Sequence, residues 1–154
     1  MLFRSSSNYS SNPVLQMSID PYGRITKPNQ PYFYAKGPES NQTLSNGADL
    51  QFNNAIYNVG GHFNTGTYRF TAPIAGKYLF TWSVFYQNSG GGRCSLKVNN
   101  TAYNNLQMDV GVGMSQSAIM YLNAGDYASV GDWQNISGGV FYVGHSHFSG
   151  MLLG

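Results

Sequence analysis

Residues 52–82 read FNNAIYNVGGHFNTGTYRFTAPIAGKYLFTW, and the spacing of the aromatic residues in this stretch predicts the fold. The regularly spaced positions, here called the aromatic ladder, are Phe52, Asn58, Phe63, Phe70, Gly76, Tyr78, Phe80 and Trp82. From Gly76 onward the ladder takes every second position, which is the side-chain period of a β-strand. The longer intervals upstream are expected to place the earlier aromatic side chains on other strands around the same core. The ladder therefore predicts a β-sandwich.

The β pattern continues over most of the chain from Pro31 onward. The segments expected to form strands are 31–35, 67–72, 77–87, 93–98, 106–110, 116–122, 127–134 and 140–153. Residues 48–59 are expected to hold one or two short strands around Phe52 and Ile56. Clusters of Gly, Asn and Ser separate them, and no apolar stripe with a 3.6-residue period and helix caps occurs. About ten short strands with frequent turn signals indicate an all-β antiparallel sandwich or jelly roll.

Segment 77–87, KYLFTWSVFYQ, is apolar or aromatic on both faces of its expected strand. Such a strand is expected to be buried on both faces. A single sandwich leaves one face of each sheet in water, so the second face of this strand calls for another subunit.

Composition excludes several classes of protein. The chain of 154 residues is long enough for one domain with a full core, and only 9% of its residues are charged. Its net charge is +2 and no run of Lys or Arg occurs, so no nucleic-acid-binding surface is expected. No apolar stretch reaches the roughly 18 residues of a membrane span. The single cysteine, Cys94, cannot form an internal disulfide and is expected to pack as a small apolar residue.

Residues 1–30 differ from the rest of the chain, because they are rich in Ser and Asn and are interrupted by prolines. Residues 21–23 are a turn signal, and the short apolar pieces 14–15 and 17–19 are expected to form small strands or to pack on a neighbour. The segment lacks the apolar run of a signal peptide. We therefore expect residues 1–30 to be an attachment segment or stem and residues 31–154 to be the head domain. The alternative for residues 1–30 is a flexible tail without a fixed structure.

The aromatic ladder resembles the signature of the C1q globular head domain at each defining position, with Trp82 where Phe or Tyr is usual. Residues 122–126, LNAGD, and 148–153, FSGMLL, resemble two further segments of that family, so the resemblance covers roughly residues 31–154. It implies a ten-stranded antiparallel jelly-roll sandwich, shared with tumour necrosis factor, that forms homotrimers and acts as a binding module. The residues that we expect in the core and at the trimer interface are Phe52, Phe63, Phe70, Tyr78, Phe80, Trp82 and Phe148.

Residues 19–33, IDPYGRITKPNQPYF, are similar to a short leader that precedes such heads in structural proteins of marine tailed phages. This second resemblance implies a virion protein at the particle surface, as a head or tail fibre tip. The expected partners are other virion proteins, bound through residues 1–30, and a host cell-surface polysaccharide or protein, bound through the loops of the head. A capsid decoration protein without host contact and a secreted C1q-like lectin are the alternatives.

Two histidines raise the question of a metal ion. His145 and His147 alternate with Ser146 in the last expected strand, so both imidazoles are expected on the face turned away from Phe148. The resemblance places that face near the threefold axis, where three copies would gather imidazoles suited to a first-row transition metal. The alternative is a pair of hydrogen-bonded histidines near an interface.

A calcium site is the other metal site that the sequence raises. The resemblance raises this possibility, because some members of the family bind calcium with loop carboxylates. Asp109 and Asp132 are the best candidate pair of ligands. Calcium needs several oxygen ligands at once, however, and the chain has only six acidic residues, which are scattered. No cofactor is expected to be required.

Aromatic and amide side chains near expected loops and strand ends form a candidate recognition surface. Aromatic faces stack on sugar rings or anchor protein contacts, and amides supply hydrogen bonds. The candidate residues are Tyr103, Asn104, Asn105, Trp133, Gln134 and Asn135. For the aromatic members, burial in the core or the trimer interface is the alternative. No nucleophile motif or spaced carboxylate pair occurs, so no enzymatic activity is expected.

Overall fold

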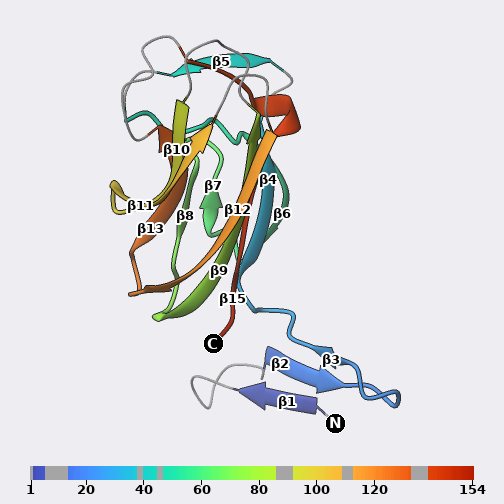
Figure 1. The fold of residues 1–154 in the computed structure, drawn as a ribbon. Helices are drawn as coiled ribbons and strands as arrows, with labels where there is room; N and C mark the ends of the chain where they lie inside the picture. Colours follow the sequence, from blue (N-terminus) through green and yellow to red (C-terminus); the bar gives the residue numbers. More distant parts are fainter. Residues whose placement is uncertain are drawn as a thin grey trace. The chain divides into compact units, whose positions relative to one another are not determined.

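The computed structural model describes residues 2–5, 14–37, 40–44, 47–85, 92–108, 113–132 and 139–154. The chain divides into two compact units, residues 1–30 and residues 31–154. Figure 1 shows both units, and each is described by itself.

The N-terminal unit is a small antiparallel sheet of β1 (Leu2–Ser5), β2 (Val14–Ile19) and β3 (Ile25–Thr26), in that order. The turn expected at residues 21–23 lies between β2 and β3. The Asp20 carboxylate accepts hydrogen bonds there from the backbone N–H groups of Tyr22 (2.9 Å) and Arg24 (3.0 Å). Gly23 takes the left-handed conformation that closes the turn, with φ of 81°. Strands β1 and β3 were not among the expected ones.

The head unit contains two five-stranded sheets, which Figure 1 shows as the two layers of a sandwich. Sheet 1 has the order β12-β9-β15-β4-β6, and sheet 2 has the order β11-β10-β13-β8-β7. The strands of sheet 1 are β4 (Tyr32–Lys36), β6 (Asn54–Val59), β9 (Gly76–Phe85), β12 (Gly113–Leu122) and β15 (His147–Leu152). Those of sheet 2 are β7 (Phe63–Asn64), β8 (Arg69–Thr71), β10 (Gly92–Val98), β11 (Thr101–Met108) and β13 (Tyr127–Asp132). The described pairings within both sheets are antiparallel. The all-β jelly-roll prediction is therefore confirmed.

The aromatic ladder fills the space between the two sheets. Phe33 of β4 stacks on Phe63 and Phe70 of sheet 2, with ring centroids 4.7 and 5.0 Å apart, and it meets Phe148 of β15 edge-on at 4.9 Å. Phe80 of β9 lies 5.8 Å from both Phe70 and Phe148. Offset and edge-on aromatic pairs at such distances add to the stabilisation from apolar burial, so this cluster is the centre of the core.

Two positions of the aromatic ladder, Asn58 and Gly76, carry no aromatic side chain, and each is occupied by its residue for a different physical reason. Asn58 joins β6 to β7, because its side chain donates to the carbonyl of Phe63 (2.8 Å) and accepts from the N–H of the same residue (3.0 Å). Gly76 lies against the end of the chain. A Cβ at Gly76 would be 2.9 Å from Leu152 and 3.2 Å from the carbonyl oxygen of Gly154, so only glycine fits without a shift.

The prediction of a single strand over residues 140–153 was wrong. The structure has β14 (Gly139–Tyr142), which pairs with β5 (Asn41–Leu44), then a 3₁₀ turn η1 (Val143–His145), and then β15. The buried hydroxyl of Ser146 holds the break, since it donates to the carbonyl of Tyr142 (3.0 Å) and accepts from the N–H of Phe85 (3.2 Å).

Of the one or two short strands expected around Phe52 and Ile56 within residues 48–59, the structure has one, around Ile56. Only β6 forms a strand there, and residues 50–53 are irregular. This stretch is held by backbone contacts to β13, including an isolated bridge between Asp49 and Gly131 and a hydrogen bond of 2.8 Å from the N–H of Leu50 to the carbonyl of Val130.

Candidate interaction face

Strand β9 turns two chemically different sides to the two faces of sheet 1. Tyr78, Phe80 and Trp82 point into the core and are fully buried. Their neighbours Leu79 and Thr81 point away from sheet 2 and are half-buried in a single chain. The second side of β9, which the sequence predicts to be covered by another subunit, is thus part of a face that one chain leaves open. We call it the open face of sheet 1.

The strand register aligns the side chains of the open face in rows that cross the whole sheet. One row is largely apolar and consists of Ile119, Leu79, Met151, Tyr32 and Val59. Ile119, Met151 and Tyr32 are 61%, 42% and 40% exposed. Large exposed apolar groups gathered on one face of a protein mark an interaction surface, whereas the same groups scattered singly do not.

The next row along the strands carries hydroxyl groups. It consists of Ser117, Thr81, Ser149, Tyr34 and Tyr57. The Thr81 and Ser149 hydroxyl oxygens lie 2.6 Å apart and are hydrogen-bonded. The open face therefore has an apolar row beside a polar row. Each hydroxyl group of the polar row can both donate and accept a hydrogen bond.

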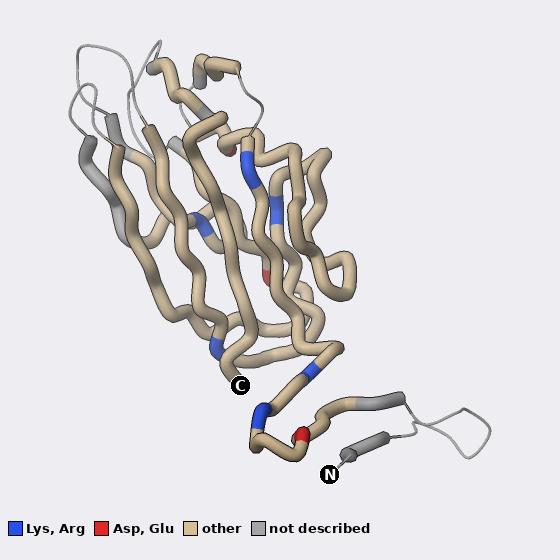
Figure 2. Tube along the Cα trace, turned by 90° about the vertical axis from the view of Figure 1, so that its right-hand side faces the viewer, with Lys and Arg blue, Asp and Glu red and all other residues tan. Residues whose placement is uncertain are grey.

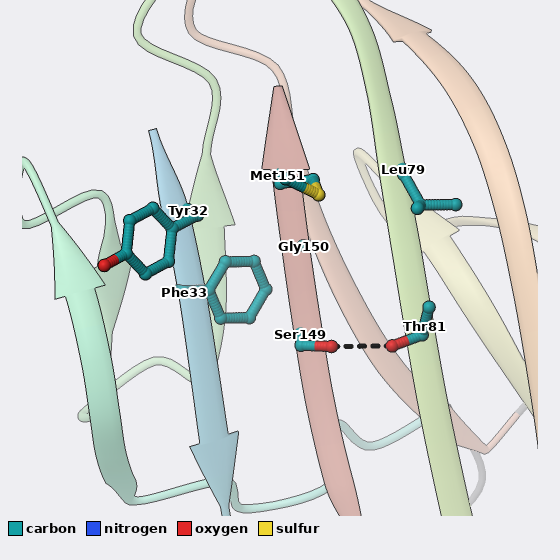
Figure 3. A pocket seen from close by; sticks show the side chains of 7 residues that line it. All are labelled: Tyr32, Phe33, Leu79, Thr81, Ser149, Gly150 and Met151. Carbon is teal, nitrogen blue, oxygen red and sulfur yellow. Dashed lines mark hydrogen bonds between the residues drawn. The ribbon is translucent and has the colours of Figure 1, made fainter. Parts of the chain in front are cut away.

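A pocket of about 260 Å³ lies where the apolar row and the hydroxyl row meet. Figure 3 shows its walls: Tyr32 from β4, Leu79 and Thr81 from β9, and Ser149 and Met151 from β15, with Phe33 and Gly150 completing the lining. Apolar groups form most of this lining, and the Thr81–Ser149 hydroxyl pair lies at one side. Such a pocket suits a side chain or ligand with an apolar body and one polar end.

Charge is nearly absent from sheet 1. The charged residues of its five strands are Lys36, at the end of β4, and Lys77, near the start of β9. Figure 2 shows how sparsely Lys, Arg, Asp and Glu are spread along the described chain. A face without ionic groups can be buried without the cost of desolvating charges.

His147 lies on the open face, in a third row with Ser83 and Lys36. Its Nδ1 is hydrogen-bonded to the Ser83 hydroxyl at 2.7 Å, and its ring stacks on Tyr34 at 5.4 Å. Burial and, to a smaller extent, the Lys36 cation lower the pKa of His147. Both effects favour the neutral form of the imidazole.

The expectation that His145 and His147 share one strand face was wrong. His145 precedes β15 in the 3₁₀ turn η1, where it is exposed and stacks on Tyr142 at 4.5 Å. Ser146 breaks the strand alternation on which the expectation depended. No group of three or more His, Cys, Asp or Glu side chains with metal-binding geometry occurs among the residues that the structure describes.

The seven residues expected in the core and at the trimer interface are all buried within one chain, as core. A second subunit would therefore meet their outward-pointing neighbours on the open face instead. The trimer interface itself stays a prediction.

The predicted recognition residues are not brought together in the described part of the chain. Tyr103 is 42% exposed on β11 of sheet 2. Asn104 and Asn105 belong to the same strand, but their side chains lie outside the described part, as do residues Trp133, Gln134 and Asn135 altogether. Asp109 also lies outside it, and so does the side chain of Asp132, so the calcium pair stays a prediction.

A buried ionic cluster between sheet 2 and residues 47–49 was not expected. Lys97, 4% exposed at its side chain, forms an ion pair with Asp49, which also accepts hydrogen bonds from Ser129 (3.0 Å) and Arg69 (3.3 Å). Lys97 also donates to the carbonyl of Gly47 at 2.8 Å. The sequence carries no signal for this cluster, because its members come from four separate segments.

The fold agrees with comparisons to known proteins. Residues 32–153 match the C1q domain, and the chain belongs to that family. Domains of this family are typically trimeric and are generally not enzymes. Cys94 is buried and forms no disulfide. The described part of the chain contains no helix that is long and apolar enough to cross a membrane.

Solved structures give the same fold. The globular domain of zebrafish complement 1qA protein superimposes with a TM-score of 0.67 at 18% identity, covering 81% of this chain and 98% of that one. Murine APRIL gives a TM-score of 0.60 at 10% identity, covering 80% and 99% of the two chains. Eiger TNF from S. frugiperda gives 0.57 at 15% identity, covering 82% and 94%. A search of curated proteins finds no match.

Proposed function

We propose that the chain is the subunit of a non-enzymatic, homotrimeric structural and adhesion protein of a phage virion, a head or tail fibre tip. In this proposal the C1q-like heads trimerise through the open face of sheet 1, the loops of the head bind the host surface, and residues 1–30 attach to other virion proteins. The open face is the observation that carries the trimer, because it combines exposed apolar side chains with an almost complete lack of charge.

A trimer presents three identical heads to the host surface, so weak binding by each head can still give firm adhesion. When one loop surface is bound, the other two act at a high effective concentration, so avidity exceeds single-site affinity. The virion assignment is supported by residues 19–33, which are similar to leaders of phage structural proteins, and by the separate compact unit that residues 1–30 form. No cofactor is needed for this function.

Light scattering of the purified protein at micromolar concentration tests the trimer. We expect three times the mass of the 16.9 kDa chain. A stable monomer under these conditions would contradict the proposal.

Two further measurements separate the proposed function from its alternatives. Binding of the purified protein to cells of the candidate host, or to their extracted polysaccharide, is expected for adhesion. Failure to bind across plausible hosts would favour a capsid decoration protein. A gene neighbourhood without capsid and tail genes would instead favour a secreted C1q-like lectin.

A further inference from the structure

The symmetry of a closed trimer narrows down which parts of the open face meet. In a ring of three identical subunits each contact is heterologous, so it joins two different patches of the chain rather than one patch to itself. One patch must be complementary to the other and present on the same molecule. This inference rests on the proposed trimer and asks which two patches these are.

The first patch is edge strand β12. It is ten residues long, carries no charged residue and no proline, and forms one edge of sheet 1. A long edge strand without such protection offers a template for contact with another chain. Its two large outward side chains, Ile119 and Tyr121, are 61% and 64% exposed, the highest exposures among the large apolar side chains of the head unit that the structure describes.

The other edge strand of sheet 1 is a poorer candidate. Strand β6 is six residues long and its pairing with β4 is interrupted by a bulge. The ring of Tyr57 on β6 already lies 6.4 Å from that of Tyr32. By contrast, no side-chain hydrogen bond or ring contact joins Tyr121 to any residue in the described part of the chain.

The second patch is the pocket between β4, β15 and β9. Its volume of about 260 Å³ lies below the range of roughly 300–1,000 Å³ that is usual for small-molecule sites, so it suits a single side chain better. Its walls are apolar, and the Thr81–Ser149 hydroxyl pair at one side retains lone pairs and one donor proton after their mutual hydrogen bond. An apolar ring that ends in a hydroxyl group matches this chemistry.

We propose that Tyr121 of each copy inserts into the Thr81–Ser149 pocket of the next copy around the ring. In this proposal the tyrosine ring covers Leu79 and Met151, and the phenol hydroxyl exchanges hydrogen bonds with the Thr81–Ser149 hydroxyl pair. Each copy donates one tyrosine and receives one, so three identical contacts close the trimer. Buried tyrosines of this kind carry a large share of interface stability.

A charge-exchange experiment on the full chain tests this pairing. Tyr121→Lys and Ser149→Asp are each expected to raise the concentration at which the trimer dissociates by about 30-fold or more. The double variant Tyr121→Lys/Ser149→Asp is expected to recover at least about tenfold of that loss, because the new lysine of one copy faces the new aspartate of the next. Tyr103→Lys, which changes an exposed tyrosine of sheet 2, is the matched control and is expected to leave assembly unchanged.

A milder variant guards against misfolding. Tyr121→Phe keeps the ring and loses only the phenol hydroxyl, so the dissociation concentration is expected to rise about fivefold. Circular dichroism of every variant checks that the fold is retained.

The outcomes distinguish the inference from the proposed function. A wild-type chain that is monomeric at micromolar concentration contradicts the trimer. A trimeric wild type whose stability does not change in folded Tyr121→Lys leaves the trimer standing and overturns the pairing. A Tyr121→Lys trimer that is weakened but not rescued by Ser149→Asp places Tyr121 against another surface and likewise overturns it.

Discussion

At the scale of single residues, Gly150 shows how tightly the aromatic core is packed. A Cβ at this position would lie 2.6 Å from Phe80 and 2.8 Å from Phe33, both closer than real contacts allow. Gly150→Ala is therefore expected to lower the free energy of unfolding by about 1–3 kcal/mol through overpacking. Gly113→Ala is the matched control, since its nearest neighbour, Phe85, is 3.5 Å away and the change should stay within about 0.5 kcal/mol.

Urea unfolding at one fixed protein concentration measures both glycine variants, because unfolding of an oligomer depends on concentration. If Gly150→Ala unfolds at the same urea concentration as the wild type, the contacts around Gly150 do not constrain the core as described.

His147 is expected to make stability depend on pH. Its pKa is lowered in the folded chain, so between the ordinary value of 6.5 and the lowered value the unfolded chain binds more protons than the folded one. The contribution is fully present above pH 6.5 and is lost as the pH falls below that value. The melting temperature of the wild type should drop between pH 7.5 and 5.5, and that of His147→Gln should drop less.

His145→Gln is the control for this titration, because His145 is exposed in η1 and the Ser83 hydroxyl is hydrogen-bonded to His147. It should follow the wild-type pH profile. A His147→Gln profile that coincides with the wild-type profile would mean that this imidazole does not report on folding.

At the scale of elements, the buried ion pair fixes a segment that has little secondary structure of its own. Lys97 joins β10 to residues 47–49 through Asp49 and the Gly47 carbonyl. Lys97→Ala would leave the 11%-exposed carboxylate of Asp49 with Arg69 as its remaining cation, and we expect a loss of about 3–5 kcal/mol. Lys27→Ala removes an exposed lysine of the N-terminal unit, outside the open face, and should have little effect. Thermal unfolding of both variants gives the comparison, and equal melting temperatures would rule out a stabilising role for the pair.

Elements with a regular pattern could be predicted from the sequence, and elements fixed by single tertiary contacts could not. Strand β9 alternates cleanly, so its core side and its open side can be assigned from the sequence alone. A short strand was expected around Phe52, yet the ion pair of Asp49 and the contacts to β13 hold residues 48–53 in an irregular path. Likewise, the hydroxyl of Ser146 breaks the last strand and separates His145 from His147, which no periodicity reveals.

The candidate site was predictable only in outline. Both faces of β9 were expected from the sequence to be buried, which predicted a cover, although the outward side of this strand also carries Lys77, Thr81 and Ser83. Which residues stand beside Leu79 and Thr81 on the open face depends on strand order and register, because β12, β15 and β4 come from distant parts of the chain.

At the scale of the whole molecule, the two units of the chain are expected to differ in how stable each is by itself. The described buried hydrophobic residues belong to the head, from Phe33 to Phe148, whereas the N-terminal unit is a three-stranded sheet of short strands. Sheets of that size are marginal in water without a packing partner. An attachment segment that gains its order from the particle would have this character.

Truncation tests this division of labour. A chain of residues 31–154 keeps the Pro31 carbonyl, which accepts a hydrogen bond of 3.0 Å from the N–H of Leu152. It should melt within about 2 °C of the full chain and should have three times the mass of its own shortened chain. A chain that starts at residue 37 loses β4 with Phe33, the ring that joins the two sheets, and should fail to fold. Dissociation or a clear loss of melting temperature in residues 31–154 would mean that residues 1–30 help to hold the heads together.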